Sequence, residues 1–195
     1  MRLSLVTAPT TEPVTLDEAK AHLRVDGTAE DALITALIQA AREHVESQTG
    51  RALITQTWDG TLDSFPARGA IVLPKPPLVS VTSVKHIDAA GAEQTMNPSD
   101  YSVEKPAGPH AQEGRILLGY GKSWPSTRCQ SNAVTIRFEA GYGAADKVPA
   151  ALKAAMLLAI GDLYQNRERQ ALSSMQFYEN KSAELLLFPF RILRF

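Results

Sequence analysis

The sequence predicts an α+β fold in which an antiparallel β region is inserted between two helical segments. Residues 29–49 and 149–166 carry apolar side chains at the three-and-four spacing of an amphipathic helix. The residues between them form short runs of β-branched and aromatic side chains, separated by proline and glycine. Each helix has an apolar stripe that must be covered, so we expect these two long helices to pack together across the insertion.

Composition and charge describe an ordinary globular protein. The 195 residues are 44% hydrophobic and 21% charged, with a formal net charge of −1. This balance lacks the excess of basic residues that is typical of proteins gripping nucleic acid through many phosphates. Cys129 is the single cysteine, so no internal disulfide forms, and no apolar run is long enough to span a bilayer. We expect a soluble protein made in a reducing cytoplasm, with no membrane partner.

Residues 1–50 are expected to form an N-terminal helical segment. A short strand at residues 2–7 comes first, and Thr15 and Glu18 then form an S/T-x-x-E capping box that begins a short helix. The long helix follows a turn at residues 26–28, with Thr28 as its cap and Gly50 just past its end. Its predicted apolar stripe is Leu33, Ile34, Leu37, Ile38, Ala41 and Val45, and its predicted polar face is Glu30, Asp31, Gln39, Arg42, Glu43 and Glu46.

Residues 51–147 are expected to form the β-rich insertion. Repeated short strands with intervening turns are typical of an antiparallel sheet or a small barrel. Three prolines between the second and third strands, Pro74, Pro76 and Pro77, favour an edge or a corner there. The candidate strands are residues 53–62, 70–73, 79–88, 93–96, 101–104, 115–118 and 133–140.

Residues 148–195 are expected to supply the second long helix and an apolar tail, completing one compact unit. A polar loop at residues 167–174 separates the two. Pro189 prevents a helix from continuing, so the tail is predicted to be extended, and it either folds onto its own helices or lies in a groove or sheet edge of a partner. The helix stripe is Leu152, Ala155, Met156, Ala159, Ile160 and Leu163, and the tail carries Leu185, Leu186, Leu187, Phe188, Phe190, Arg191, Ile192, Leu193, Arg194 and Phe195.

Residue patterns that would support catalysis are missing. The four histidines, His22, His44, His86 and His110, do not have the spacing of metal ligands, and no phosphate loop or nucleophile elbow occurs. Carboxylate pairs occur only in first helical turns, where capping explains them. We therefore expect no enzyme, no metal site and no cofactor, although an active site with an unrecognised pattern would remain if His86, His110 and Asp100 gathered in one pocket.

Aromatic residues flanked by glycine or proline are the most unusual local feature. Gly119-Tyr120-Gly121, Gly141-Tyr142-Gly143 and Trp124-Pro125 permit tight turns that either present a ring or pack it at a corner of the core. An alternative function follows from them. If the β region closed into a barrel with Trp58, Tyr120, Trp124 and Tyr142 at its mouth, the protein would be a ligand- or glycan-binding module.

Several stretches together resemble the head–tail connector (adaptor) proteins of long-tailed bacteriophages and gene transfer particles. The similar stretches cover roughly residues 10–170: PVTLDEAKAHLRVD at 13–26, AAREHVE at 40–46, TGRALI at 49–54, LPKPPL at 73–78, GYG at 141–143 and VPAAL at 148–152. Each is short, and their order and spacing carry the resemblance.

The resemblance implies a structural protein of the virion, at the head–tail interface on the capsid vertex. It implies a self-assembled ring of twelve copies beneath the portal protein, which extends the DNA channel and presents a platform to the downstream stopper or tail-completion protein. DNA would touch the lumen transiently and without sequence preference. The C-terminal end would reach the portal, through Phe188, Phe190, Arg191, Ile192, Leu193, Arg194 and Phe195.

Overall fold

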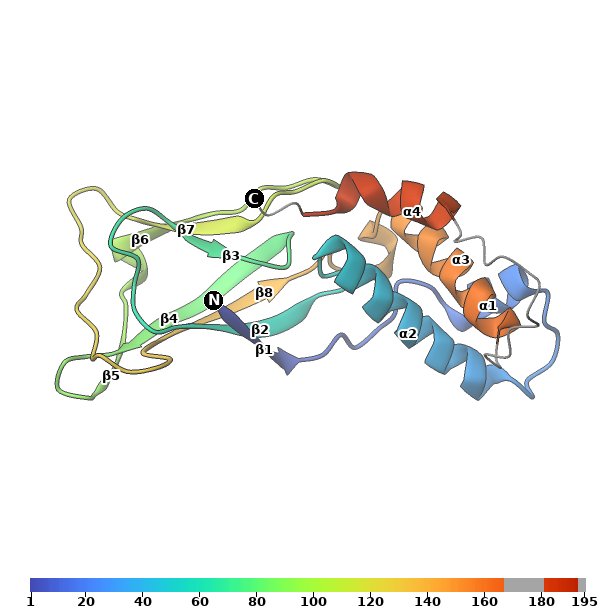
Figure 1. The fold of residues 1–195 in the computed structure, drawn as a ribbon, viewed down its shortest axis with the longest axis horizontal. Helices are drawn as coiled ribbons and strands as arrows, with labels where there is room; N and C mark the ends of the chain where they lie inside the picture. Colours follow the sequence, from blue (N-terminus) through green and yellow to red (C-terminus); the bar gives the residue numbers. More distant parts are fainter. Residues whose placement is uncertain (167–180, 193–195) are drawn as a thin grey trace, which may run out of the picture.

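The computed structural model describes residues 1–166 and 181–192, and it shows an elongated α+β molecule. The helices gather at one end and the strands at the other (Figure 1). The α+β class and the antiparallel pairing predicted from the sequence are confirmed. The predicted loop at residues 167–174 and the last three residues of the tail, Leu193, Arg194 and Phe195, lie outside the described residues.

The β region consists of two open antiparallel sheets rather than a closed barrel. Sheet A has the order β1-β2-β8-β4-β5, and sheet B has the order β3-β7-β6. Of the two predicted arrangements, an antiparallel sheet or a small barrel, the structure shows the open sheet, and β3 pairs with β7 in sheet B rather than joining sheet A. The strands are β1 (Arg2–Thr7), β2 (Gln56–Leu62), β3 (Ile71–Leu73), β4 (Leu78–Ile87), β5 (Glu93–Thr95), β6 (Tyr101–Glu104), β7 (Gly114–Leu118) and β8 (Val134–Ala140).

Alternating apolar residues of the two sheets form one core. Phe138 and Ile136 of β8 and Ile116 of β7 are fully buried, and Phe65, Leu73 and Val84 belong to the same cluster. The prolines lie where the chain passes from β3 in sheet B to β4 in sheet A, as a corner requires.

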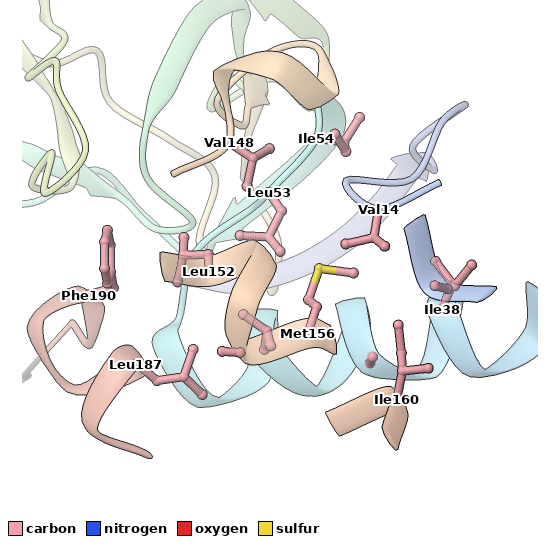
Figure 2. Close-up of a cluster of buried hydrophobic side chains, with 14 of the residues drawn as sticks. Val14, Ile38, Leu53, Ile54, Val148, Leu152, Met156, Ile160, Leu187 and Phe190 are labelled. Carbon is pink, nitrogen blue, oxygen red and sulfur yellow. The ribbon is translucent and has the colours of Figure 1, made fainter. Parts of the chain in front are cut away.

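The helical end is built from segments far apart in sequence. α2 (Asp31–Thr49) packs against α3 (Ala150–Gln165), α1 (Leu16–Leu23) touches both, and α4 (Lys181–Leu187) covers α3. Three short 3-10 turns complete the described elements: η1 (Pro98–Asp100), η2 (Ala145–Lys147) and η3 (Phe188–Phe190). Figure 2 shows the core that the helices share, which includes Ile38, Leu152, Met156 and Ile160.

The ends of α1 and α2 follow the sequence signals with one exception. Thr15 and Glu18 form the predicted reciprocal capping box. Gly50 takes the left-handed conformation after α2, with φ 74°. Thr28, however, makes no side-chain cap for α2, because the helix begins at Asp31 with Glu30 as its N-cap residue; only the Thr28 carbonyl accepts a hydrogen bond, from the Asp31 amide.

The apolar stripe of α2 is rotated relative to the prediction. Ile34, Ile38, Ala41 and Val45 are buried as expected, whereas Leu33 is exposed. Arg42 and Glu46, which the spacing placed on the polar face, are both buried. The start of the β region and the segment before α1 cover that side of the helix, so its polar residues are enclosed with their partners.

Candidate functional site

The C-terminal segment, defined here as residues 181–192, folds onto the helical core of its own chain. Leu187 and Phe190 are only 4% and 5% exposed, and both join the cluster around Leu152 (Figure 2). Residues 188–190 form η3 rather than the extended strand predicted from Pro189, and the residues before them form α4. The reason is local: Lys-Ser-Ala-Glu-Leu-Leu-Leu before the proline is rich in strong helix formers, and proline is acceptable in the first turn of η3.

Arg51 anchors this segment to the rest of the molecule. The Arg51 side chain is 1% exposed, and it donates from Nε to the Phe190 carbonyl at 2.6 Å and from Nη1 to the Ala111 carbonyl at 2.8 Å. Burial lowers the pKa of Arg51, while Tyr142 acts in the opposite direction. One cation thus joins η3, the loop before β7 and the end of α2.

Two further contacts hold the end of the segment. The Ile192 amide donates to the Thr49 carbonyl at 3.0 Å, and the Phe190 ring lies 4.5 Å from the His110 ring. Arg191 reaches Gln48 of α2 and Glu184 of α4. The segment is therefore held through backbone, aromatic and charged groups together.

The outer side of the same segment is apolar and exposed. Leu185 and Phe188 are 73% and 63% exposed, although each is adjacent in the chain to residues that point inward. Beneath α4, a hollow of about 290 Å³ is lined by the small side chains Ala155, Ala159 and Ala183, together with polar groups. The segment thus presents one apolar face to its own core and another to solvent.

This arrangement corrects part of the sequence-based prediction for the tail. Phe190 fills the chain's own core and is not available to a partner in this conformation, and Ile192 is bonded to α2. Phe188 remains exposed, and Arg191 is partly exposed at the surface. For residues 181–192 the sequence left both own-core packing and partner docking open, and the structure shows own-core packing for Leu187 and Phe190.

A second polar cluster joins the helical end to the β region. Glu46 accepts hydrogen bonds from the Leu53 amide at 2.8 Å, from Gln56 Nε2 at 2.5 Å and from Arg42 at 3.1 Å. Arg42 also pairs with Glu12 at 2.9 Å. Burial raises the pKa of Glu46 and of Glu12, and Arg42 opposes both shifts. The cluster fixes the direction in which the chain leaves α2, which is why β2 begins at Gln56 and not at Leu53.

The glycine-flanked aromatics do not come together. Tyr120 points fully into solvent, Trp124 stacks on Phe65 with ring centroids 4.8 Å apart, and Lys75 lies 5.5 Å from the Trp58 ring. Tyr142 donates to the Pro109 carbonyl at 2.6 Å and lines a different hollow from Trp124. The predicted aromatic barrel mouth is therefore wrong.

The glycine before Tyr142 has a packing reason. Gly141 has φ 134°, and a Cβ there would lie 2.4 Å from the Ile54 carbonyl oxygen. Any side chain would force the crossing between the helical end and the β region apart. Gly141-Tyr142-Gly143 thus forms a tightly packed corner of the core, whereas the Gly-Tyr-Gly sequence around Tyr120 presents its ring to solvent.

The residues considered for catalysis or metal binding remain apart in the structure. His86 is buried on β4 against Phe65, while His110 contacts Phe190 and Asp100 pairs with Lys122. Within residues 1–166 and 181–192, no group of three His, Cys, Asp or Glu side chains could hold a metal ion. Among the same residues no helix is long and apolar enough to cross a membrane.

The fold has counterparts among solved structures of gene transfer agent particles. The structure aligns with a chain in the neck of an empty gene transfer agent (GTA) particle computed with C6 symmetry, with a TM-score of 0.81 and 26% identity. It also aligns with a chain in the virion of native GTA (TM-score 0.80, 27% identity) and one in the native neck computed with C12 symmetry (TM-score 0.79, 26% identity). In each case the alignment covers 100% of this chain and 97% of the other.

The chain belongs to the head completion protein family, whose model matches residues 12–178. The connector-type identity expected from the sequence is therefore confirmed, and the protein is a structural head–tail component. No match was found among curated proteins.

Proposed function

We propose that this protein forms a closed ring in the particle neck, between the portal protein and the next head-completion protein. The observation that carries the proposal is the full-length structural match to neck subunits of gene transfer agent particles. One such neck was computed with C12 symmetry, so a ring of twelve copies is the stoichiometry we propose. The lumen of the ring would extend the DNA channel.

The exposed side of the C-terminal segment is the surface that we propose for the portal. Leu185 and Phe188 provide two large apolar groups on a short element that is already ordered, which limits the entropy lost on binding. Arg191 lies beside them and supplies a charged group at the rim. In this proposal Phe190 and Arg51, on the buried side of the segment, hold α4 in the orientation in which Phe188 faces outward.

The test is electron microscopy of the purified protein, alone and mixed with its portal. We expect rings with twelvefold symmetry that cap one end of the portal, and a central opening in end views. Phe188→Ser and Leu185→Ser proteins should fold normally and lose portal binding, while Leu163→Ser, an exposed leucine on α3, serves as the matched control. Portal binding that survives both C-terminal substitutions would remove this surface from the proposal.

A further inference from the structure

The strand β1 is the least protected sheet edge in the described molecule. An open edge offers unpaired backbone groups to another strand, and proteins usually protect edges with short length, charge or proline. β3 and β5 are three residues long, and β6 carries Glu104, which pairs with Arg115 on β7. β1 is six residues long, and its residues from Leu3 to Thr7 are uncharged.

The side chains of β1 are also unusually exposed to solvent for an apolar strand. Five of its six residues are exposed, and Leu5 and Val6 are each 45% exposed. The register with β2 breaks between Leu5 and Thr7, which leaves Val6 without a partner residue on β2. The strand thus has an apolar surface and an open backbone edge at the same place.

The opposite edge of sheet A is open as well. β5 pairs only with Lys85 to Ile87 at the end of β4. Along the outer side of β4 from Leu78 to Ser83, no strand pairs among the residues that the structure describes. Val79 on this stretch is 39% exposed, and it borders a hollow of about 730 Å³ next to the loop at residues 105–109.

We propose that β1 of one copy pairs with residues 78–83 of β4 in the neighbouring copy, so that sheet A continues from subunit to subunit. This inference rests on the proposed ring. The two edges have equal length, six residues each, and both present exposed aliphatic side chains. Joining one edge to the opposite edge of an identical chain repeats a single rotation, which closes into a ring when the rotation divides the circle.

The spacing of strands in a sheet sets the size of such a ring. Strands are spaced by about 4.8 Å, so the four strands between successive contacts, β1, β2, β8 and β4, add roughly 19 Å per copy. Twelve copies would give a circumference on the order of 230 Å and a diameter of about 73 Å at the level of the sheet.

The test compares two valines on different sheet edges. Val6 on β1 and Val72 on β3 have the same side chain and the same 45% exposure, and β3 is an edge strand of sheet B. Val6→Lys should abolish ring formation, because lysine blocks edge pairing and cannot be buried against a neighbour, whereas Val72→Lys should form rings like the unmodified protein. Negative-stain microscopy and native mass spectrometry, with and without portal, count the copies, and the melting temperatures of both variants should match that of the unmodified protein.

Each outcome separates this inference from the proposed function. Rings of Val6→Lys protein would overturn the role of β1 and leave the neck function intact. Rings of Val79→Lys protein would overturn the assignment of β4 as the partner edge. If all three lysine variants, Val72→Lys included, fail to form rings, the added charge explains the loss and the inference is overturned. If the unmodified protein forms no ring either alone or on the portal, both the inference and the proposed function fail.

Discussion

The positively charged Arg51 side chain is buried and donates hydrogen bonds to two carbonyl oxygens. Arg51→Met should lower the free energy of unfolding by about 1–3 kcal/mol, because the carbonyls of Phe190 and Ala111 lose their donor inside the protein. Urea unfolding measures the change, and Arg115→Met, at an exposed site on β7, is the control with a change below about 0.5 kcal/mol. Equal stability of the Arg51 variant would mean that the two carbonyls find other donors.

The buried carboxylate of Glu46 predicts a pH dependence. Burial raises the pKa of Glu46 above its ordinary value of 4.5, so in the window between the two values the folded state binds more protons than the unfolded state. The contribution of Glu46 to the free energy of unfolding therefore falls as the pH rises through this window.

Glu46→Gln removes this titration. As the pH rises above 4.5, the unfolding free energy of the variant should improve relative to that of the unmodified protein. Denaturant unfolding of both proteins between pH 4 and pH 7 gives the comparison. A constant difference between the two proteins across this range would show that the carboxylate does not resist ionisation in the folded state.

At the same scale, the sequence predicted the caps better than it predicted burial. A capping box and a glycine after a helix are local chemistry, so Thr15, Glu18 and Gly50 were identified from the sequence alone. Whether Arg42 and Glu46 are buried depends on where a segment distant in the chain docks. Spacing defines a face of the helix, and it does not show that a polar face will be enclosed with partners.

Among the elements, the C-terminal segment permits a direct comparison of two phenylalanines. Phe190→Ala should reduce the free energy of unfolding by about 3 kcal/mol, because a buried ring is lost from the helical core. Phe188→Ala should change it by less than about 0.5 kcal/mol, since that ring is exposed. Thermal or urea unfolding tests both variants.

Deleting residues 188–195 should consequently lower the melting temperature, and this differs from the expectation for a tail that orders only on a partner. The deletion removes Phe190 from the core and leaves Arg51 without one of its two acceptors. A truncated protein that melts like the full chain would show that the segment is held only weakly to the helices.

Elements with strong local signals were predicted within a few residues. The strands at Arg2–Thr7 and Tyr101–Glu104 coincide with their predictions, and the others differ by one to three residues at an end. The β2 strand starts later because Leu53 and Ile54 turn into the helical core. Pro189 predicts an extended chain after it, whereas the helix-forming residues before it make α4 and residues 188–190 make a 3-10 turn.

For the whole molecule, the sequence predicts α1, α2, α3 and the β region, but it predicts neither α4 nor two open sheets. The pairing of β3 with β7, and of β1 with β2, joins residues that are far apart in the chain. The alternation of apolar and polar residues shows which side chains of a strand face inward. It does not show which strand lies beside it, because that depends on how all the strands are arranged. The open edges of sheet A, on which the subunit contact is proposed, are therefore visible only in three dimensions.

The proposed channel leads to a prediction about DNA. A lumen through which DNA slides must not hold it tightly, and the chain has a net charge of −1, with 20 basic and 21 acidic residues. Several of its exposed arginines and lysines are already paired with carboxylates, such as Arg137 with Asp59 and Arg115 with Glu104. Cations held in such pairs are less available to neutralise phosphates, so binding to free duplex should be weak and independent of sequence.

The salt dependence of that binding measures how many phosphates are neutralised. For duplex DNA the slope of log K against log salt is about −0.9 for each phosphate contact, so binding that rests on phosphate contacts summed over a ring should be strongly salt-dependent. Fluorescence anisotropy with duplexes of unrelated sequence, between 50 and 200 mM salt, gives both the affinity and the slope. Tight binding to one sequence at physiological salt would contradict a sliding channel, because base contacts strong enough to specify a sequence would also stop the DNA from moving.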